Sequence, residues 1–210
     1  VRTGADRCFA AARPEPQVQI VTLAPADCVV VVSTNASRYE AQAAKELRKH
    51  LGLITGTEPE IVSSVGGEAG GYAFHVGTIP PGGREPADPE EALWRVTSEG
   101  AWFWGGERRG AQFAVYDFLE DQLGVRWIEP GDAGLFYREQ HPVLLTVGEG
   151  QWAPALKGRS IRQGLRPQPI APDASEDEKA RLEEHNRRVE DTLAWKSRMR
   201  MGGSTPGGSH

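Results

Sequence analysis

The stretch WFWGGERRGAQFAVYDFLEDQLGVRW (Trp102–Trp127) decides the fold, because a strand pattern changes to a helix pattern inside it. Before Gly105, the aromatic run predicts a β-strand with Trp102 and Trp104 on one face and Phe103 on the other. From Arg109 onward, apolar residues recur at helical spacing, and Gly124 is placed to end the helix. The sequence therefore predicts a strand, a glycine-rich turn and an amphipathic helix. The apolar positions of that helix are 111, 114, 115, 118, 119 and 123.

The turn GGERRG (residues 105–110) raises the question of phosphate binding. A dinucleotide-binding turn requires G-x-G-x-x-G and a Walker loop requires G-x-x-x-x-G-K-[ST], and the glycines here have neither spacing. The preceding strand also forms half of a predicted hairpin with LWRVTS (93–98), which turns at Glu99-Gly100. We interpret the glycines as architecture, with Gly110 allowing the helix to pack closely on the sheet. Nucleotide binding at Gly105–Gly110 stays open as a minor alternative.

The residues before this stretch predict further strands and a first helix. CVVVV (28–32) is a β-branched run typical of a strand covered on both faces. The segment 37–56 is an amphipathic helix in which Ser37 and Glu40 have capping-box spacing, and its phase places His50 on the solvent side. The other predicted strands are QVQIVTL (17–23), EIVSSV (60–65), YAFHVGT (72–78) and PVLLTV (142–147).

The charge balance changes near residue 154. Residues 1–154 hold 13 basic and 21 acidic side chains, a net charge of −8, whereas residues 155–210 hold 11 and 8, a net charge of +3. This change indicates a boundary, and the acidic larger part argues against nucleic-acid binding. Beyond the boundary, ALKGRSIRQG (155–164) predicts a strand, a proline-rich loop follows, and residues 175–201 predict a long helix begun by Ser175 and Glu178.

Several chemistries are disfavoured by spacing. The five histidines show no metal-binding pattern, two cysteines cannot form a zinc site, and no G-x-S-x-G elbow is present, so we expect neither metal nor cofactor. Glu129 and Asp132 follow a strand and are candidates for acid–base work, although a turn is the plainer interpretation. Cys28 opens the valine run and is expected to be a small buried residue, while a pair with Cys8 stays open.

Two surface features also have alternative interpretations. The tryptophans at 94, 102, 104 and 127 can belong to the core or stack on sugar rings. The basic residues of the last helix alternate with acidic ones, which indicates a solvated, ion-paired helix.

No apolar run approaches the length of a membrane span, so we expect no membrane contact. The first residues, VRTGADRCFAAARPEP, contain neither an initiator Met nor the apolar core of a signal peptide.

At this point AAKELRKHLGLITG, a strand that ends in HVGT, and WFWGGERRGAQFAVYDFLEDQLGVRWIEPGD together resemble a known domain. This is the small α+β domain that precedes the catalytic barrel in family 20 β-hexosaminidases and family 67 α-glucuronidases. The resemblance covers about residues 18–160 and is strongest to uncharacterised bacterial relatives. It implies a domain without catalytic residues that packs against its own catalytic barrel, and a protein that is secreted or periplasmic.

The resemblance continues more weakly into the last third of the chain. PALKGRS resembles the first barrel strand of family 20, in which an arginine five positions after a proline grips sugar hydroxyls; Pro154 and Arg159 fit that spacing. The aspartate and second arginine of that pattern are absent from IRQGLRP. LAWKSRMRMGG and GGSH resemble the first barrel helix and the loop beyond it. The resemblance thus makes Arg159 and His210 candidate substrate-binding residues, with Asn186, Trp195 and Arg198 as packing or cleft positions.

Together these observations predict an α+β fold, a mixed sheet with two main helices on one face. The expected organisation is an N-terminal extension (1–17), a non-catalytic accessory domain (18–150) and the first βα unit of a truncated (β/α)8 barrel (151–210). The whole protein would hydrolyse glycosidic bonds on a carbohydrate substrate bound by the barrel, with catalytic carboxylates beyond residue 210, so this chain alone would be inactive. The alternatives are a carbohydrate-binding module that uses exposed tryptophans and a scaffold module.

Overall fold

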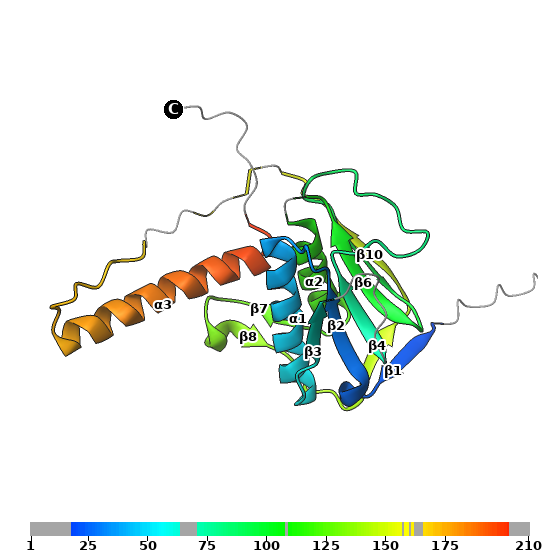
Figure 1. Cartoon of the computed structure of the whole chain (residues 1–210), viewed down its shortest axis with the longest axis horizontal. Coiled ribbons are helices and arrows are strands. Elements are labelled where there is room, and N and C mark those ends of the chain that lie inside the picture. The colour runs from blue at the N-terminus through cyan, green and yellow to red at the C-terminus, as the bar shows by residue number, and fades with distance from the viewer. Residues whose placement is uncertain are drawn as a thin grey trace, which may run out of the picture.

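The computed structural model describes residues 18–63, 71–107, 109–156, 158–159, 161 and 166–201. It has an α+β architecture in which a mixed sheet carries two helices on one face and a third helix projects away from them (Figure 1). None of the helices in these residues is both long and apolar enough to cross a membrane.

The main sheet has six strands in the order β10-β5-β6-β4-β2-β3. The pairs β2–β3, β2–β4 and β4–β6 are parallel, whereas β5–β6 and β10–β5 are antiparallel. The bounds of these strands are β2 Cys28–Val32, β3 Glu60–Ser63, β4 Tyr72–Val76, β5 Ala92–Val96, β6 Gly100–Gly105 and β10 Gly148–Trp152. Because β10 belongs to this sheet, the sheet extends two residues past residue 150.

Two small sheets complete the β structure. Strand β1 (Ile20–Leu23) pairs antiparallel with β9 (Val143–Thr146), and β7 (Arg126–Trp127) pairs with β8 (Leu135–Phe136). Two short 3-10 turns, η1 (Pro25–Asp27) and η2 (Asp132–Gly134), lie between strands. The predicted strands at 17–23 and 142–147 are therefore confirmed as strands, but they form a sheet of their own.

The helices begin where the capping residues predict. α1 (Arg38–Thr55) has the expected capping box, in which the Ser37 hydroxyl accepts from the Glu40 amide and the Glu40 carboxylate accepts from the Ser37 amide. α2 spans Gly110–Asp121, and α3 spans Glu176–Arg198 with the Ser175 hydroxyl accepting from the Glu178 amide. Gly56 ends α1 and Gly124 follows α2, both at positive φ, where glycine avoids the strain of a side chain.

The core lies between the sheet and the pair α1–α2. Strand residues that point toward the helices, such as Val30, Phe74 and Phe103, are fully buried, as are Leu47 of α1 and Phe118 of α2. The Phe118 ring meets the edges or faces of Phe74, Phe103 and Trp94. Aromatic pairs of this kind add to the stabilisation that apolar burial provides.

The GGERRG turn has the architectural role inferred from its spacing. A Cβ placed on Gly110 would lie 2.5 Å from the Cα of Gly105, so the two backbones approach too closely for any side chain. The amide of Gly106 donates to the Glu91 carbonyl at 2.9 Å, which ties the turn to the start of β5. Glycine at 105 and 110 therefore allows α2 to lie directly on β5 and β6.

One prediction about local structure is wrong, and another stays a prediction. In the segment 155–164, Arg159 forms a β-bridge and the described residues 155, 156, 158 and 161 belong to no strand, so the strand expected there is not decided. His50 is buried and not on the solvent side, because β7 and the end of α3 cover the flank of α1 that faces away from the sheet. The remainder of 155–164 lies outside the described residues.

The close approach at Gly110 generates a stability prediction. We expect Gly110→Ala to lower the free energy of unfolding by about 3 kcal/mol, because α2 must move away from the β5–β6 hairpin. Gly148→Ala is the matched control, since a Cβ there meets nothing within 4 Å. Urea unfolding of both variants measures the difference, and equal stabilities would contradict the role given to the turn.

Candidate functional site: an arginine seam

Three arginines from the segment after residue 154 insert into acidic positions of the sheet-and-helix unit. We call this set the arginine seam: Arg159 pairs with Glu90, Arg198 with Glu46, and Arg200 with both Asp117 and Glu120. Each of these side chains is at most a quarter exposed. The seam therefore joins the two parts of the chain that the charge balance distinguishes.

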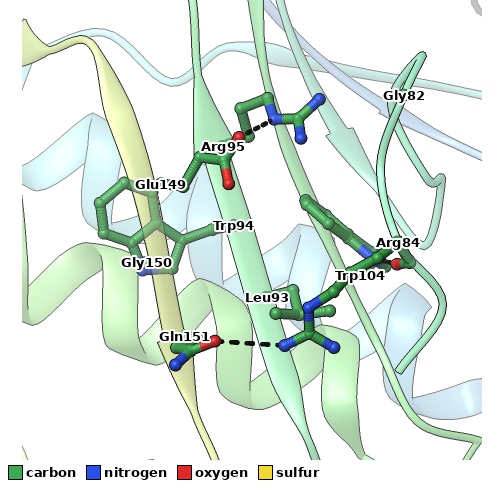
Figure 2. A pocket seen from close by; sticks show the side chains of 9 residues that line it. All are labelled: Gly82, Arg84, Leu93, Trp94, Arg95, Trp104, Glu149, Gly150 and Gln151. Carbon is green, nitrogen blue, oxygen red and sulfur yellow. Dashed lines mark hydrogen bonds and ion pairs between the residues drawn. The ribbon is translucent and has the colours of Figure 1, made fainter. Parts of the chain in front are cut away.

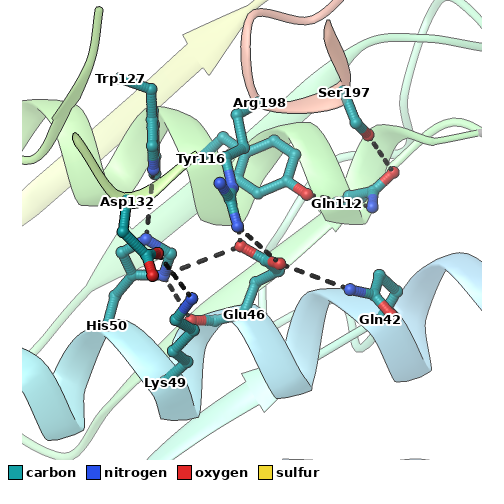
Figure 3. A network of polar contacts seen from close by, with 10 residues as sticks. All are labelled: Gln42, Glu46, Lys49, His50, Gln112, Tyr116, Trp127, Asp132, Ser197 and Arg198. Carbon is teal, nitrogen blue, oxygen red and sulfur yellow. Dashed lines mark hydrogen bonds and ion pairs between the residues drawn. The ribbon is translucent and has the colours of Figure 1, made fainter. Parts of the chain in front are cut away.

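The first part of the seam is centred on Glu46, which α1 presents on the flank away from the sheet. Arg198 donates to both Glu46 carboxylate oxygens, from Nε at 3.1 Å and from a terminal nitrogen at 3.2 Å (Figure 3). The Gln42 amide also donates to this carboxylate. Two-point pairing of this kind fixes the direction of the guanidinium as well as its distance.

His50 completes this cluster from one turn along α1. Its Nε2 accepts from the indole N–H of Trp127 at 3.2 Å, so Nδ1 carries the proton and donates to the Glu46 carbonyl at 2.7 Å. The Trp127 carbonyl in turn accepts from the indole N–H of Trp195 on α3 at 3.0 Å. Burial lowers the pKa of His50, which is held in its neutral form.

The second part of the seam surrounds Trp152 at the edge of the main sheet. The guanidinium carbons of Arg159 and Arg200 lie 5.3 and 5.5 Å from the centre of the Trp152 ring. Cations over an indole face gain electrostatic attraction that increases as water is removed. The same ring meets the edge of Phe113 on α2, so the two arginines contact the hydrophobic core indirectly.

Each of these two arginines is also held by acidic groups. Arg200 donates to Asp117 at 2.9 Å and to Glu120 at 2.6 Å, both on α2. Arg159 donates to Glu90 at 3.0 Å, and its Nε donates to the Arg200 carbonyl at 3.0 Å. Asp117 and Glu120 lie on the side of α2 that helical phase places outside the core. There they form an acidic socket, that is, a pair of carboxylates that binds the Arg200 guanidinium.

The candidate sugar-binding residues have different outcomes. Arg159 lies in the seam, with its nitrogens bonded to Glu90 and to the carbonyls of Arg200 and Leu156. These contacts neither supply nor exclude a sugar contact, so its substrate-binding role stays a prediction. His210 lies outside the described residues. Trp195 donates to the Trp127 carbonyl and Arg198 pairs with Glu46, whereas the barrel-packing or cleft role expected for both stays a prediction.

The aromatic and histidine candidates are mostly in the core. Trp94, Trp104 and Trp127 are each 4% exposed, which removes them as open stacking platforms. Trp102 is half-buried and stacks on His75 at 5.1 Å between ring centres. Burial lowers the pKa of His75 as well.

Glu129 and Asp132 lie on an exposed turn. Asp132 is 3.8 Å from Lys49 and its side chain is almost wholly in solvent, so the acid–base role considered for these residues stays a prediction. Cys28 carries a free thiol whose pKa burial raises to about 11. Cys8 lies outside the described residues. No group of three His, Cys, Asp or Glu in the described ranges is arranged to hold a metal ion.

The arrangement is suited to holding two segments together. Its charges are paired, most of the side chains are shielded from water, and its histidine is neutral. Such pairs contribute orientation more than net stability, because removing charges from water costs about as much as the pairing returns. The sequence pattern predicted that the arginines of residues 175–201 belong to a solvated, ion-paired helix. The opposite net charge of the two parts, from which we predicted only a boundary, is the signal that could have indicated the seam.

No family model matches the chain, and no curated protein matches it. Solved structures do. A GH20 β-N-acetylhexosaminidase from Streptomyces coelicolor A3(2) is 18% identical with a TM-score of 0.46, over 69% of this chain and 26% of that one. A Streptomyces plicatus N-acetyl-β-hexosaminidase is 17% identical with a TM-score of 0.45, over 71% and 29%.

A third similar structure is the GH20 exo-β-N-acetylglucosaminidase from Vibrio harveyi, at 16% identity and a TM-score of 0.42, over 67% of this chain and 18% of that one. The chain thus resembles GH20 β-hexosaminidases in structure over about 70% of its length. It spans less than a third of these proteins, and at such identities and TM-scores the likeness concerns the fold alone. The resemblance to family 67 α-glucuronidases stays a prediction.

The Glu46–Arg198 pair generates a prediction about attachment of α3. We expect Arg198→Met to lower the free energy of unfolding by about 3 kcal/mol, because Glu46 is left charged and buried without its partner. Urea unfolding measures the loss. The control is Arg188→Met, which removes an exposed pair with Glu184 on the same helix and should cost under about 0.5 kcal/mol. Equal losses of stability in the two variants would mean that the Glu46–Arg198 pair does not attach α3 to α1.

His50 generates a prediction about pH. Its folded pKa is lower than the ordinary value of about 6.5, so below that pH the unfolded chain binds more protons. The stability that neutral His50 contributes is therefore complete above about pH 6.5 and is lost as pH falls through the folded pKa. We expect the stability advantage of the parent over His50→Gln to shrink from pH 7.5 to pH 5. His75 is present in both proteins and cancels, and parallel pH profiles would contradict the assignment.

Proposed function

We propose that the sheet-and-helix unit is the non-catalytic accessory domain of a carbohydrate-active glycoside hydrolase, and that the segment after it begins the catalytic barrel. The observation that carries the proposal is the arginine seam. Three arginines of the later segment enter acidic sockets on α1, on α2 and before β5, as expected of a domain whose work is to hold the start of a neighbouring domain.

The shape of α3 supports the same proposal. Only Val189 is fully buried along this helix, and Leu193 is 50% exposed. Ile161, before the helix, is 47% exposed. A helix that is held mainly through its C-terminal half and still exposes apolar residues such as Leu193 matches the first helix of a barrel, whose other strands and helices would cover it.

The glycosidase part rests on the sequence resemblance around GGERRGAQFAVYDFLEDQLGVRW. In the whole protein, two carboxylates would cleave the glycosidic bond, or one carboxylic acid would act with the acetamido group of the substrate. These carboxylates would lie beyond residue 210. The accessory domain would take no part in the bond cleavage, and its contribution would be to fix where the barrel begins.

The test starts with the reading frame that follows residue 210. We expect it to encode a barrel pattern with an acidic pair, and we expect the protein that includes it to release chromophore from a panel of chromogenic glycosides. The 210-residue chain serves as the inactive control. A following sequence without that pattern, or an extended protein that cleaves none of the panel, would overturn the proposal.

A further inference from the structure

A cavity of about 530 Å³ lies on the face of the main sheet opposite α1 and α2. Strand alternation turns Leu93, Arg95 and Trp104 to this face, while their neighbours enter the core. Its volume lies within the range of about 300–1,000 Å³ that is usual for small-molecule sites. The lining residues are Gly82, Arg84, Leu93, Trp94, Arg95, Trp104, Glu149, Gly150 and Gln151.

Two polar bridges cross the cavity from opposite sides of Leu93 (Figure 2). In one, Arg95 donates to Glu149 at 2.6 Å; in the other, Arg84 donates to Gln151 at 3.2 Å. Each bridge places hydrogen-bond donors beside acceptors at the cavity wall. Donor–acceptor pairs at this spacing suit hydroxyl groups, which donate and accept at once.

Leu93 and Trp104 lie beneath the bridges and are each 4% exposed, so they offer a ligand little apolar surface. The indole N–H of Trp104 is bonded to the Arg84 carbonyl at 2.9 Å, which satisfies the only polar atom of the indole. The contacts that the cavity offers are therefore mainly those of its polar walls, which suit the hydroxyl groups at the rim of a sugar ring.

The charges of the cavity favour a neutral ligand. Arg95 is compensated by Glu149, and Arg84 by Glu91 at 2.5 Å, where the hydrogen bond from Arg84 also lowers the Glu91 pKa. An anion would meet the Glu149 carboxylate, and a cation would meet both guanidinium groups. We propose that this cavity binds a neutral saccharide of one or two sugar rings, held by hydroxyl contacts to Arg84, Arg95, Glu149 and Gln151.

This site lies on the other side of the sheet from the helices that carry most of the seam, and it does not depend on the proposed function. It needs neither a barrel nor a catalytic carboxylate. An accessory unit with such a site would hold a saccharide near the surface of the sheet in addition to holding the following segment.

The experiment is a titration of the ¹⁵N-labelled 210-residue chain with glucose, N-acetylglucosamine and cellobiose. We expect the indole N–H signal of Trp104 to shift with at least one of these sugars, with a Kd of about 1 mM. Glu149→Ala and Gln151→Ala should each raise that Kd about tenfold, since each removes one charged or bridging partner. Both residues are exposed on an edge strand, so the variants should fold.

Glu60→Ala is the matched control, because Glu60 is an exposed glutamate on β3, the opposite edge strand of the same sheet. Its Kd should equal that of the parent. Three results would overturn the proposal: no shift with any sugar, unchanged affinity in both cavity variants, or tighter binding of glucuronate than of glucose. None of these results bears on whether the extended protein is a glycosidase.

Discussion

The contact between the backbones of Gly105 and Gly110 determines where α2 lies, and much of the molecule depends on α2. This helix supplies Phe118 to the aromatic core and packs on α1. It also presents Asp117 and Glu120 to Arg200. A side chain at either glycine would separate the helix from the hairpin and displace the acidic sockets together with the core.

The molecule uses two kinds of attachment for two purposes. Within the sheet-and-helix unit, burial of apolar side chains provides the stability, as in most domains. Between this unit and residues 159–201, attachment is made by guanidinium groups, carboxylates and indole rings. Charged pairs shielded from water tolerate only one register, because a misplaced partner leaves a buried charge uncompensated. The seam therefore specifies the position of the later segment more than it adds to overall stability.

Much of the fold was predictable because local rules and packing agree. The capping box at Ser37, the valine run of β2 and the change of period after Arg109 each place an element correctly. The strand β10 was not predicted, because GEGQW has two glycines and no apolar alternation, and it forms only because β5 offers an edge. Likewise, the separate pairing of β1 with β9 depends on contacts far apart in sequence.

The seam was less predictable than the core, and His50 shows why. Helical phase distinguishes the side facing the sheet from the remainder, but it does not reveal that β7 and α3 cover a second flank. Glu46, Asp117 and Glu120 resemble ordinary solvated acids until the arginines that meet them are known. Arg198 and Glu46 are separated by 152 residues, and no local spacing rule connects them. Only the unequal net charge of the two parts of the chain hinted at their complementarity.

The antiparallel pairing of β1 with β9 has a consequence for how such a unit is inherited. Ile20 faces Thr146 in this pair, and β10 follows directly, so the first strand of the unit is bonded to the strand that precedes its last one. The chain then leaves the unit at Trp152, which is paired with Ala92 at the start of β5. Because both ends of the unit are tied into sheets, a different neighbour could be joined after Trp152 without rethreading the interior. The acids on α1 and α2 would then be the part that a new neighbour must match.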